Sequence, residues 1–478
     1  MTIFYWLVNL TKGVKPRITL NSLQAIMRCT REGSIVKMVG QWWKEGDEKV
    51  VIRCYNDQRD RIEMECVEKS CEIGNDQTFL FTDTLGDPIC RIRNTPRFTM
   101  LVAEVRNKLV GSIQGSVKPV KLQDKSVNVG YVLALRVMPP YRRHGIGSML
   151  VRKLEEWFMS HNADYAYMAT QKDNEASLGL FVGKLGYVIF RNPAILVNPV
   201  NPRGLKLPSD IGIRKLKVKE AASWYRKHVV SNTDFFPHDI VKILRNKLSI
   251  GTWVAYYKNN DKIISWAILS VWNSSKVFKL RIGKAPLSFV ILTKVCNFVG
   301  RFLPFLGLTA LPDLFTPFGF YFLYGVHAEG PLRGKLVRTL CEHVSNMAVL
   351  DDGGECKVVV VEVDGESNGS DYSLRRCVPH WKMLSCDDDT WCIKPLKREE
   401  NTTSLSDFTN MFLNSKSRCL FVDPRDVYLN IVDKKKDISI LNLHCITPDA
   451  TRQRYVGSTF KKCKKRVKSV TRTRVIEI

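Results

Sequence analysis

The sequence lacks the cysteine and histidine spacings that are typical of zinc sites. Its 14 cysteines are scattered without a CxxC pair, and its 8 histidines form no HExxH or finger pattern. Cysteines used in this way indicate a reducing compartment rather than a disulfide framework. We therefore predict that the protein binds no metal.

Long apolar runs are also absent. No stretch reaches the roughly 18 consecutive apolar residues that a membrane-spanning helix needs. The apolar start, 3–8 IFYWLV, is too short and badly flanked to serve as a signal peptide. We therefore expect a soluble protein inside the cell, with no membrane partner, in which the 45% of hydrophobic residues build buried cores.

Acidic residues are few relative to basic ones. Lys and Arg number 73 against 47 Asp and Glu, which gives a net charge of +26 and favours polyanionic partners. The stretch 431–478 holds 13 basic and 4 acidic residues. Within it, 461–468 KKCKKRVK is typical of a nuclear-localisation signal or a nucleic-acid contact, or else of a solvated tail. Because the tail has no interleaved aromatic residues to stack on bases, nucleic-acid binding is only weakly indicated.

Between the ends of the chain, strand-like and helix-like patterns alternate. Helices are predicted from Asn56 or Asp57 to about Ser70, over 146–158, and from about Glu175 to Leu185. Strands are predicted at 49–55, 97–105, 108–117, 129–137, 165–170 and 187–197. This order predicts an α/β (α+β) fold, in which helices flank a mixed central sheet.

The second half of the chain echoes the first. Residues 150–156 LVRKLEE match 336–342 LVRTLCE, and each run follows a strand and a glycine-bearing turn. Two further matches occur in the same order, so we predict a duplicated unit. Its strands are expected at 252–257, 263–271, 319–326 and 357–363.

The turns before the two matched helices differ. The alignment puts Pro331 on Gly145 and Arg333 on Gly147. Proline has no N–H group to offer a phosphate, and an arginine side chain hinders close approach to the backbone. We therefore predict that the second half is degenerate and has lost cofactor binding.

These patterns predict a division of the chain into consecutive parts. Residues 1–48 lack clear periodicity and form an extension, and the last residues form the basic tail. The predicted parts are the extension at 1–48, a first domain at 49–200, a linker at 201–218, a degenerate second domain at 219–398, a polar segment at 399–427 and the basic tail at 428–478.

The hexamer 142–147 RRHGIG lies between a predicted strand and a predicted helix. Backbone N–H groups at the start of a helix point at a bound anion, and the helix dipole favours its negative charge. Glycines allow close approach, and the basic side chains add charge-assisted contacts. A tight strand–helix turn gives the same pattern without a ligand. A dinucleotide fold needs GxGxxG and an acidic residue about 20 positions further on, and the sequence has neither.

The loop and the segment after it resemble one superfamily. The pattern (Arg/Gln)-x-x-Gly-x-(Gly/Ala) resembles the pyrophosphate loop of the GNAT acyl-CoA N-acyltransferases, and 174–187 NEASLGLFVGKLGY resembles their Asn-x-x-Ala segment. The resemblance implies a GNAT fold followed by a second, degenerate GNAT-like half, with acetyl-CoA as the acyl donor. It also implies that the strand after the loop splays from the strand before it, and that acyl-CoA lies in the opening.

The same resemblance implies which residues contact the cofactor. They lie at the end of the strand before the loop, in the loop itself and at the start of the next helix, together with the Asn after the following strand. These residues are Leu135, Arg136, Val137, Arg142, Arg143, His144, Gly145, Ile146, Gly147, Ser148 and Asn174.

Several further runs look like the HOOKLESS-type N-acetyltransferases of plants, and this resemblance spans about 49–427. The runs are 79–92 FLFTDTLGDPICRI, 193–200 PAILVNPV, 231–237 SNTDFFP, 246–252 NKLSIGT, 378–394 VPHWKMLSCDDDTWCIK and 421–425 FVDPR. The resemblance implies a protein N-acetyltransferase in the nucleus, with the cytoplasm as a second location. Its acceptor would be a lysine or another amine, histone tails included. It implies a role in growth responses to ethylene and auxin, such as apical hook formation.

The catalytic residues are harder to assign. Many histone-type members place a Glu base about eleven residues before the loop, which here is Tyr131, and 129–141 contains no carboxylate. A tyrosine with a pKa of about 10 is a poor base at neutral pH. Glu104, on a neighbouring strand, and a water relay are the alternatives.

The sequence does not assign the general acid either. The usual tyrosine in the helix after the Asn is replaced by Phe181, and nearby Tyr187 is either an acid or a hydrogen-bonded core residue. A second hypothesis is therefore a GNAT-like regulatory protein that binds acyl-CoA without catalysis. Such a protein would act through protein contacts, self-association included.

Overall fold

The structure is a computed structural model that describes most of the chain between residues 49 and 432. Described are 49–73, 78–202, 204–282, 314–350, 355–364, 374–382, 384–386, 389–397, 418–427 and a few single positions between and after these ranges. The predicted extension at 1–48 and the basic block at 461–468 lie outside the described residues.

The chain forms two compact units. The first unit comprises Met1–Asn192, Val230–Ile240 and Asp389–Asn430, and the second comprises Pro193–Val229, Val241–Asp388 and Ile431–Ile478. Neither unit is continuous in sequence, so the units differ from the consecutive domains predicted at 49–200 and 219–398. The difference arises because each predicted domain contributes its last strand to the sheet of the other unit.

The first unit is built on a mixed sheet with the strand order β1-β3-β4-β5-β6-β17-β7, in which only β5 and β6 are parallel. The short strand β11 (Phe236–Pro237) pairs with β4. The other strands are β1 (Val51–Cys54), β3 (Arg97–Val105), β4 (Lys108–Leu122), β5 (Lys125–Val137), β6 (Tyr165–Gln171), β7 (Val188–Arg191) and β17 (Asp389–Pro395). The five strands predicted before residue 171 are therefore confirmed.

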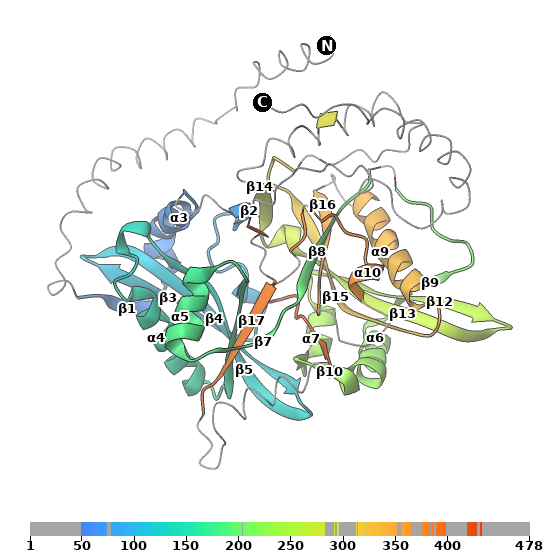
Figure 1. Ribbon diagram of the computed structural model, residues 1–478, viewed down its shortest axis with the longest axis horizontal. Helices are drawn as coiled ribbons and strands as arrows, with labels where there is room; N and C mark the ends of the chain where they lie inside the picture. Colours follow the sequence, from blue (N-terminus) through green and yellow to red (C-terminus); the bar gives the residue numbers. More distant parts are fainter. Residues whose placement is uncertain are drawn as a thin grey trace, which may run out of the picture. The chain divides into compact units, whose positions relative to one another are not determined.

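Strand β17 lies between β6 and β7, although more than 190 residues of sequence separate it from either. It pairs with β6 along its whole length, from Asp389 opposite Gln171 to Pro395 opposite Tyr165. Figure 1 shows this strand in orange among the blue and green strands of the first unit.

Three helices in the described part of the first unit cover its sheet: α3 (Asp57–Ile73), α4 (Ile146–Ser160) and α5 (Glu175–Leu185). The predicted Asn56 cap of α3 is confirmed, because its Oδ1 accepts from the N–H groups of Gln58 and Arg59. Apolar residues at spacings of three and four put Leu150, Leu154 and Phe158 of α4 on the sheet, fully buried. Burying each such side chain stabilises the fold by about 1.5–3 kcal/mol.

The prediction of one strand at 187–197 is wrong. The run forms two strands, β7 and β8 (Ala194–Pro199), which belong to the sheets of different units. Pro193 stands between them. Its ring fixes its own backbone, removes an N–H donor and restricts Asn192, so a continuous strand ladder is interrupted there.

The second unit has a six-stranded sheet with the order β8-β16-β15-β13-β12-β9. Its strands besides β8 are β9 (Gly212–Leu216), β12 (Ser249–Asn259), β13 (Lys262–Asn273), β15 (Gly319–Glu329) and β16 (Cys356–Val363). All four strands predicted in this half are confirmed. The prediction of a linker at 201–218 is corrected, because this stretch contains the edge strand β9. The basic side chains of β9 are exposed, while Leu216 is buried.

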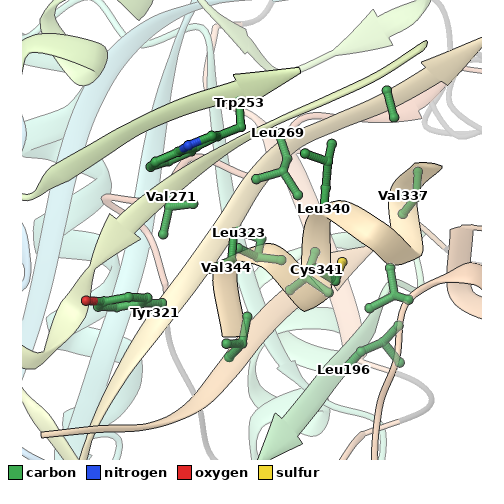
Figure 2. Packing of buried hydrophobic residues seen from close by; sticks show 14 of the residues in the cluster. Leu196, Trp253, Leu269, Val271, Tyr321, Leu323, Val337, Leu340, Cys341 and Val344 are labelled. Atoms are coloured by element: carbon green, nitrogen blue, oxygen red, sulfur yellow. The ribbon is translucent and has the colours of Figure 1, made fainter. Parts of the chain in front are cut away.

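Helix α9 (Arg333–Leu350) packs on the second sheet. Figure 2 shows Leu340, Cys341 and Val344 of α9 beside Leu269 and Leu323 of the strands below. The predicted duplication is confirmed by this arrangement. In each unit an antiparallel pair, β4–β5 or β13–β15, is followed by a helix and a parallel strand. None of the helices in the described part of the chain combines the length and apolar character needed to cross a membrane.

Candidate functional site

The parallel strands β5 and β6 pair for only part of their length. Pairing runs from Val129 opposite Tyr165 to Val132 opposite Met168, yet β5 continues to Val137 and β6 to Gln171. Within the described chain, no other strand pairs with β5 on this side. The strands therefore separate, as the resemblance implied, and leave an opening in the sheet.

A bulge in β5 accompanies this separation. The register between β4 and β5 shifts between Ser112 and Gln114, and Ala134 has a φ of 51°. A β-bulge bends its strand and re-aims the residues beyond it. Residues 135–137 lie beyond this bulge, in the part of β5 that is not paired with β6.

The loop after β5 is folded back onto the strand end. A 3₁₀ turn, η3 (Pro139–Tyr141), is followed by Arg142, whose Nε donates to the Val137 carbonyl at 3.0 Å. Arg143 and Gly145 have φ values of 71° and 78°. This left-handed conformation is costly for most residues and explains the glycine at 145.

Helix α4 begins without a capping side chain. Gly145 is its N-cap residue and no side chain of the described residues caps it, whereas Asn174 caps α5 through Ser177 N–H. No acidic residue lies in the first turn of α4. The N–H groups of the first turn and the positive end of the helix dipole therefore favour an anion at this position.

The space around the two glycines fits a phosphate group. A Cβ at Gly145 would meet no described atom within 4 Å, and a Cβ at Gly147 would lie 3.5 Å from Leu180 Cδ2, an ordinary contact. The exposed side chains of Arg142 and Arg143 add positive charge beside this helix start, and the exposed side chain of His144 adds a polar group. The residues present therefore fit the diphosphate of acyl-CoA.

Other predicted cofactor residues lie around the same opening. Leu135 and Val137 are half-buried against the α4 core, while Ile146 and Ser148 stand in the first turn of α4. Arg136 Nε contacts Glu68 Oε2 of α3 at 3.2 Å.

Asn174 is occupied by contacts within its own unit. Its Oδ1 accepts from Ser177 N–H and its Nδ2 donates to Thr170 Oγ1, each at 3.1 Å. Its contact with the cofactor stays a prediction.

The structure does not bring the three predicted catalytic residues together. Glu104 lies near the end of β3 and contacts Arg53 and, at 2.9 Å, Arg59. Tyr187 is buried in the core under α4, where its hydroxyl donates to Glu155 Oε1 at 3.0 Å. Burial, and next the Glu155 charge, raise the pKa of Tyr187 well above its ordinary value. Tyr187 therefore has the contacts of a core residue.

Tyr131 points to the other face of the sheet. A Cβ at its neighbour Gly130 would clash with Phe158 of α4, and successive strand residues alternate between faces. The Tyr131 ring stacks on Tyr167 of β6, with centroids 4.7 Å apart and an interplanar angle of 23°. Both side chains are buried, and the two residues form the last pair but one before the opening.

The sequence analysis missed a buried charged cluster on this face. Lys118 of β4 lies between Asp423 and Asp426, and the Tyr167 hydroxyl donates to Asp426 Oδ2 at 2.6 Å. The two aspartates come from 418–427 and follow Lys118 by 305 and 308 residues. The available signal was local: 421–427 FVDPRDV places charges in an apolar run.

The cluster perturbs its carboxyl groups in opposite directions. Burial would raise the pKa of Asp423, but the charges of Arg425 and Lys118 outweigh it and hold that pKa well below its ordinary value. Burial raises the pKa of Asp426, against the opposing charge of Lys118. Tyr167 has its pKa raised by burial and by Asp426, so its hydroxyl stays protonated.

Known proteins identify the family. The acetyltransferase (GNAT) family model matches residues 63–187. The Arabidopsis thaliana protein "Probable N-acetyltransferase HLS1" is 42% identical over 412 residues, covering 79% of this chain and 99% of that protein. The chain belongs to the HOOKLESS-type GNAT acetyltransferases. "Acetyl transferase GW6a" of Oryza sativa subsp. japonica is 36% identical, over 73% of this chain and 82% of that protein.

Solved structures also resemble this GNAT protein. A GCN5-related N-acetyltransferase from Sphaerobacter thermophilus matches with a TM-score of 0.44 and 14% identity, covering 74% of this chain and 98% of that one. The glucosamine N-acetyltransferase region of a fungal multi-domain GH3 β-N-acetylglucosaminidase matches with a TM-score of 0.44 and 15% identity, over 73% of this chain and 38% of that one.

The second GNAT-like unit repeats the opening but not the loop. Strand β15 has a bulge at Gly325, with a φ of 61°, and pairs with β16 only as far as Leu323. Three residues separate β15 from α9, whereas eight separate β5 from α4. Pro331 lies in this short turn, and the next N–H, that of Leu332, donates to Ser265 Oγ at 2.9 Å. These contacts fit the predicted loss of cofactor binding.

Proposed function

We propose that this protein binds acetyl-CoA in the opening between β5 and β6 and transfers its acetyl group to a protein amine. The observation that carries the proposal is the uncapped start of α4, with its two glycines and adjacent basic side chains. The family membership and the relatives named as N-acetyltransferases support it.

Each part of the opening has a role in this proposal. The N–H groups of Ile146, Gly147 and Ser148 bind the diphosphate, and Arg142 and Arg143 offset its charge. The backbone of Leu135–Val137 positions the extended arm of the cofactor. When bound, acetyl-CoA supplies the activated acyl group. The protein orients it toward the amine and excludes water, which favours transfer over hydrolysis.

We further propose that the acceptor is a lysine side chain, histone tails included, and that the protein acts in the nucleus on growth responses to ethylene and auxin. The basic block at 461–468 and the HOOKLESS-type relatives support this setting. Removing 433–478 should reduce nuclear accumulation of the tagged protein. An unchanged distribution would contradict the targeting role.

Calorimetric titration of the full chain with acetyl-CoA tests the donor, and release of free CoA with a panel of lysine peptides tests transfer. Binding with turnover supports the enzyme. Binding without turnover supports the alternative, a regulatory GNAT protein that binds acyl-CoA and acts through protein contacts. The occupied carboxylate of Glu104 and the burial of Tyr187 favour that alternative. Absence of binding would overturn both.

A further inference from the structure

The first unit has a buried carboxylate beside the opening, although 129–141 has none. Tyr131 and Tyr167 are directly paired one position before the separation of β5 and β6, and their rings stack. The Tyr167 hydroxyl donates to Asp426 Oδ2 at 2.6 Å. A short polar connection therefore leads from the side chains next to the opening to Asp426.

One carboxylate oxygen of Asp426 can still accept a hydrogen bond. Oδ2 accepts from Tyr167 and contacts Lys118, while Oδ1 is buried and accepts no hydrogen bond from the described residues. A buried carboxylate oxygen without a donor costs about 1–3 kcal/mol or more. Such an atom points to a proton or a ligand rather than to packing alone.

The charges around Asp426 do not balance. Arg425 binds Asp239 through both terminal nitrogens, at 2.8 and 2.9 Å, and also Asp423 at 2.7 Å. Lys118 is shared between Asp423 and Asp426. With all groups ionised, three carboxylates face two cations. A buried site with one excess negative charge favours uptake of a proton.

We propose that Asp426 is a positioning residue for acetyl transfer, acting through Tyr167 as the sink for the proton that the acceptor ammonium loses. Tyr167 gives its hydroxyl proton to Asp426 and takes one from the ammonium. The amine nitrogen then forms its bond to the thioester carbonyl carbon, and the bond from that carbon to sulfur breaks. Of the two protons left on the amine nitrogen, one leaves with the CoA thiolate as the free thiol and the other stays on the amide, so charge and atoms balance.

This inference rests on the proposed function and places the missing base in a segment distant in sequence. A purely structural role for the cluster would be to dock 418–427 on the sheet. Asp423 separates the two roles, because it shares Lys118 with Asp426 and pairs with Arg425, whereas the Tyr167 hydroxyl donates to Asp426. It provides a control with the same charge change in the same buried cluster.

The test compares Asp426→Asn, Tyr167→Phe and Asp423→Asn in the full chain. Acetyl-CoA affinity is measured by calorimetry and unfolding by thermal denaturation. Transfer to a histone-tail lysine peptide is followed by release of free CoA between pH 6 and 9. General-base catalysis contributes about 10²–10⁴-fold. We expect Asp426→Asn to lower kcat by at least about 10²-fold with unchanged acetyl-CoA affinity, and to remove the rise of kcat with pH.

Tyr167→Phe keeps the ring stack and should lower kcat in the same way, which covers the case in which Asp426→Asn does not fold. Asp423→Asn should lower the melting temperature but retain the pH profile. Equal kcat losses and unchanged pH profiles in both aspartate variants would overturn the proposal. The proposal would also be overturned if the wild-type protein bound acetyl-CoA but transferred no acetyl group, and in that case the assignment of the acetyl-CoA site would remain valid. Absence of acetyl-CoA binding would overturn the proposed function itself.

Discussion

Replacement of Gly147 by alanine separates cofactor binding from protein stability. The new Cβ would lie 3.5 Å from Leu180 Cδ2, 3.9 Å from Leu135 Cδ2 and 4.0 Å from Val137 Cγ2, all ordinary contacts. Gly147 is helical and has no positive φ. Since alanine in a helix is about 0.5–1 kcal/mol more favourable than glycine, the free energy of unfolding should be unchanged or slightly higher.

The same methyl group should weaken cofactor binding. It stands on the first turn of α4, where we propose that backbone N–H groups contact the diphosphate. A hydrogen bond to a charged group contributes about 1.5–3 kcal/mol, so loss of one contact corresponds to a roughly tenfold to 150-fold higher Kd for acetyl-CoA.

Calorimetry gives the Kd and urea denaturation gives the free energy of unfolding. Gly183→Ala on α5 is the matched control, because its Cβ would meet no described atom within 4 Å and Gly183 lies a full turn beyond Leu180. An unchanged Kd in a folded Gly147→Ala protein would refute the loop assignment. A large loss of stability would refute the steric argument.

Three further outcomes are expected. Tyr187→Phe removes a buried hydrogen bond to Glu155, so the free energy of unfolding should fall by about 1 kcal/mol while kcat in the transfer assay stays unchanged. A loss of kcat without a loss of stability would instead indicate that Tyr187 is the general acid. Folding lowers the pKa of Asp423, so the ionised carboxylate stabilises the protein fully above its unfolded pKa of about 3.9, and this stabilisation is lost as the pH falls further. Asp423→Asn should therefore reduce the dependence of the unfolding free energy on pH, measured by denaturation at pH 2–6. An unchanged pH dependence would contradict this expectation. Truncation before residue 418 removes both carboxylate partners of Lys118, the kind of loss that costs about 3–5 kcal/mol, and should lower the free energy of unfolding accordingly. Truncation after 432 keeps both partners and should leave the unfolding free energy of the first unit unchanged, so equal losses would contradict this expectation.

The elements fixed by short-range patterns were predictable. Strand β3 and helix α5 occupy the predicted residues, and helix α4 extends the predicted one by two, because side-chain periodicity and capping residues act within a few positions. The loop at 142–147 was recognisable for the same reason. Its basic residues and glycines are adjacent in sequence.

The catalytic surroundings were not predictable in this way. Asp426 reaches Tyr167 only because 418–427 docks on the first sheet, and β17 reaches β6 only because the second half ends in the first unit. The charges within 421–427 are a local signal, but no local pattern indicates which strand or side chain either segment contacts. The predicted catalytic residues Glu104 and Tyr187 were chosen for their positions in the sequence. In the folded protein Glu104 forms an ion pair with Arg53, and the Tyr187 hydroxyl donates to Glu155 in the core.

The sequence by itself determined nine of the strands, the three helices predicted in the first half, the duplication and the phosphate-type loop, since backbone propensity and local spacing decide these features. Only the tertiary structure decided which sheet each closing strand joins and which carboxylate stands beside Tyr131 and Tyr167. The physical reason is that strand pairing and buried charge compensation depend on partners far apart along the chain. Such partners are selected by burial and hydrogen bonding in the folded state.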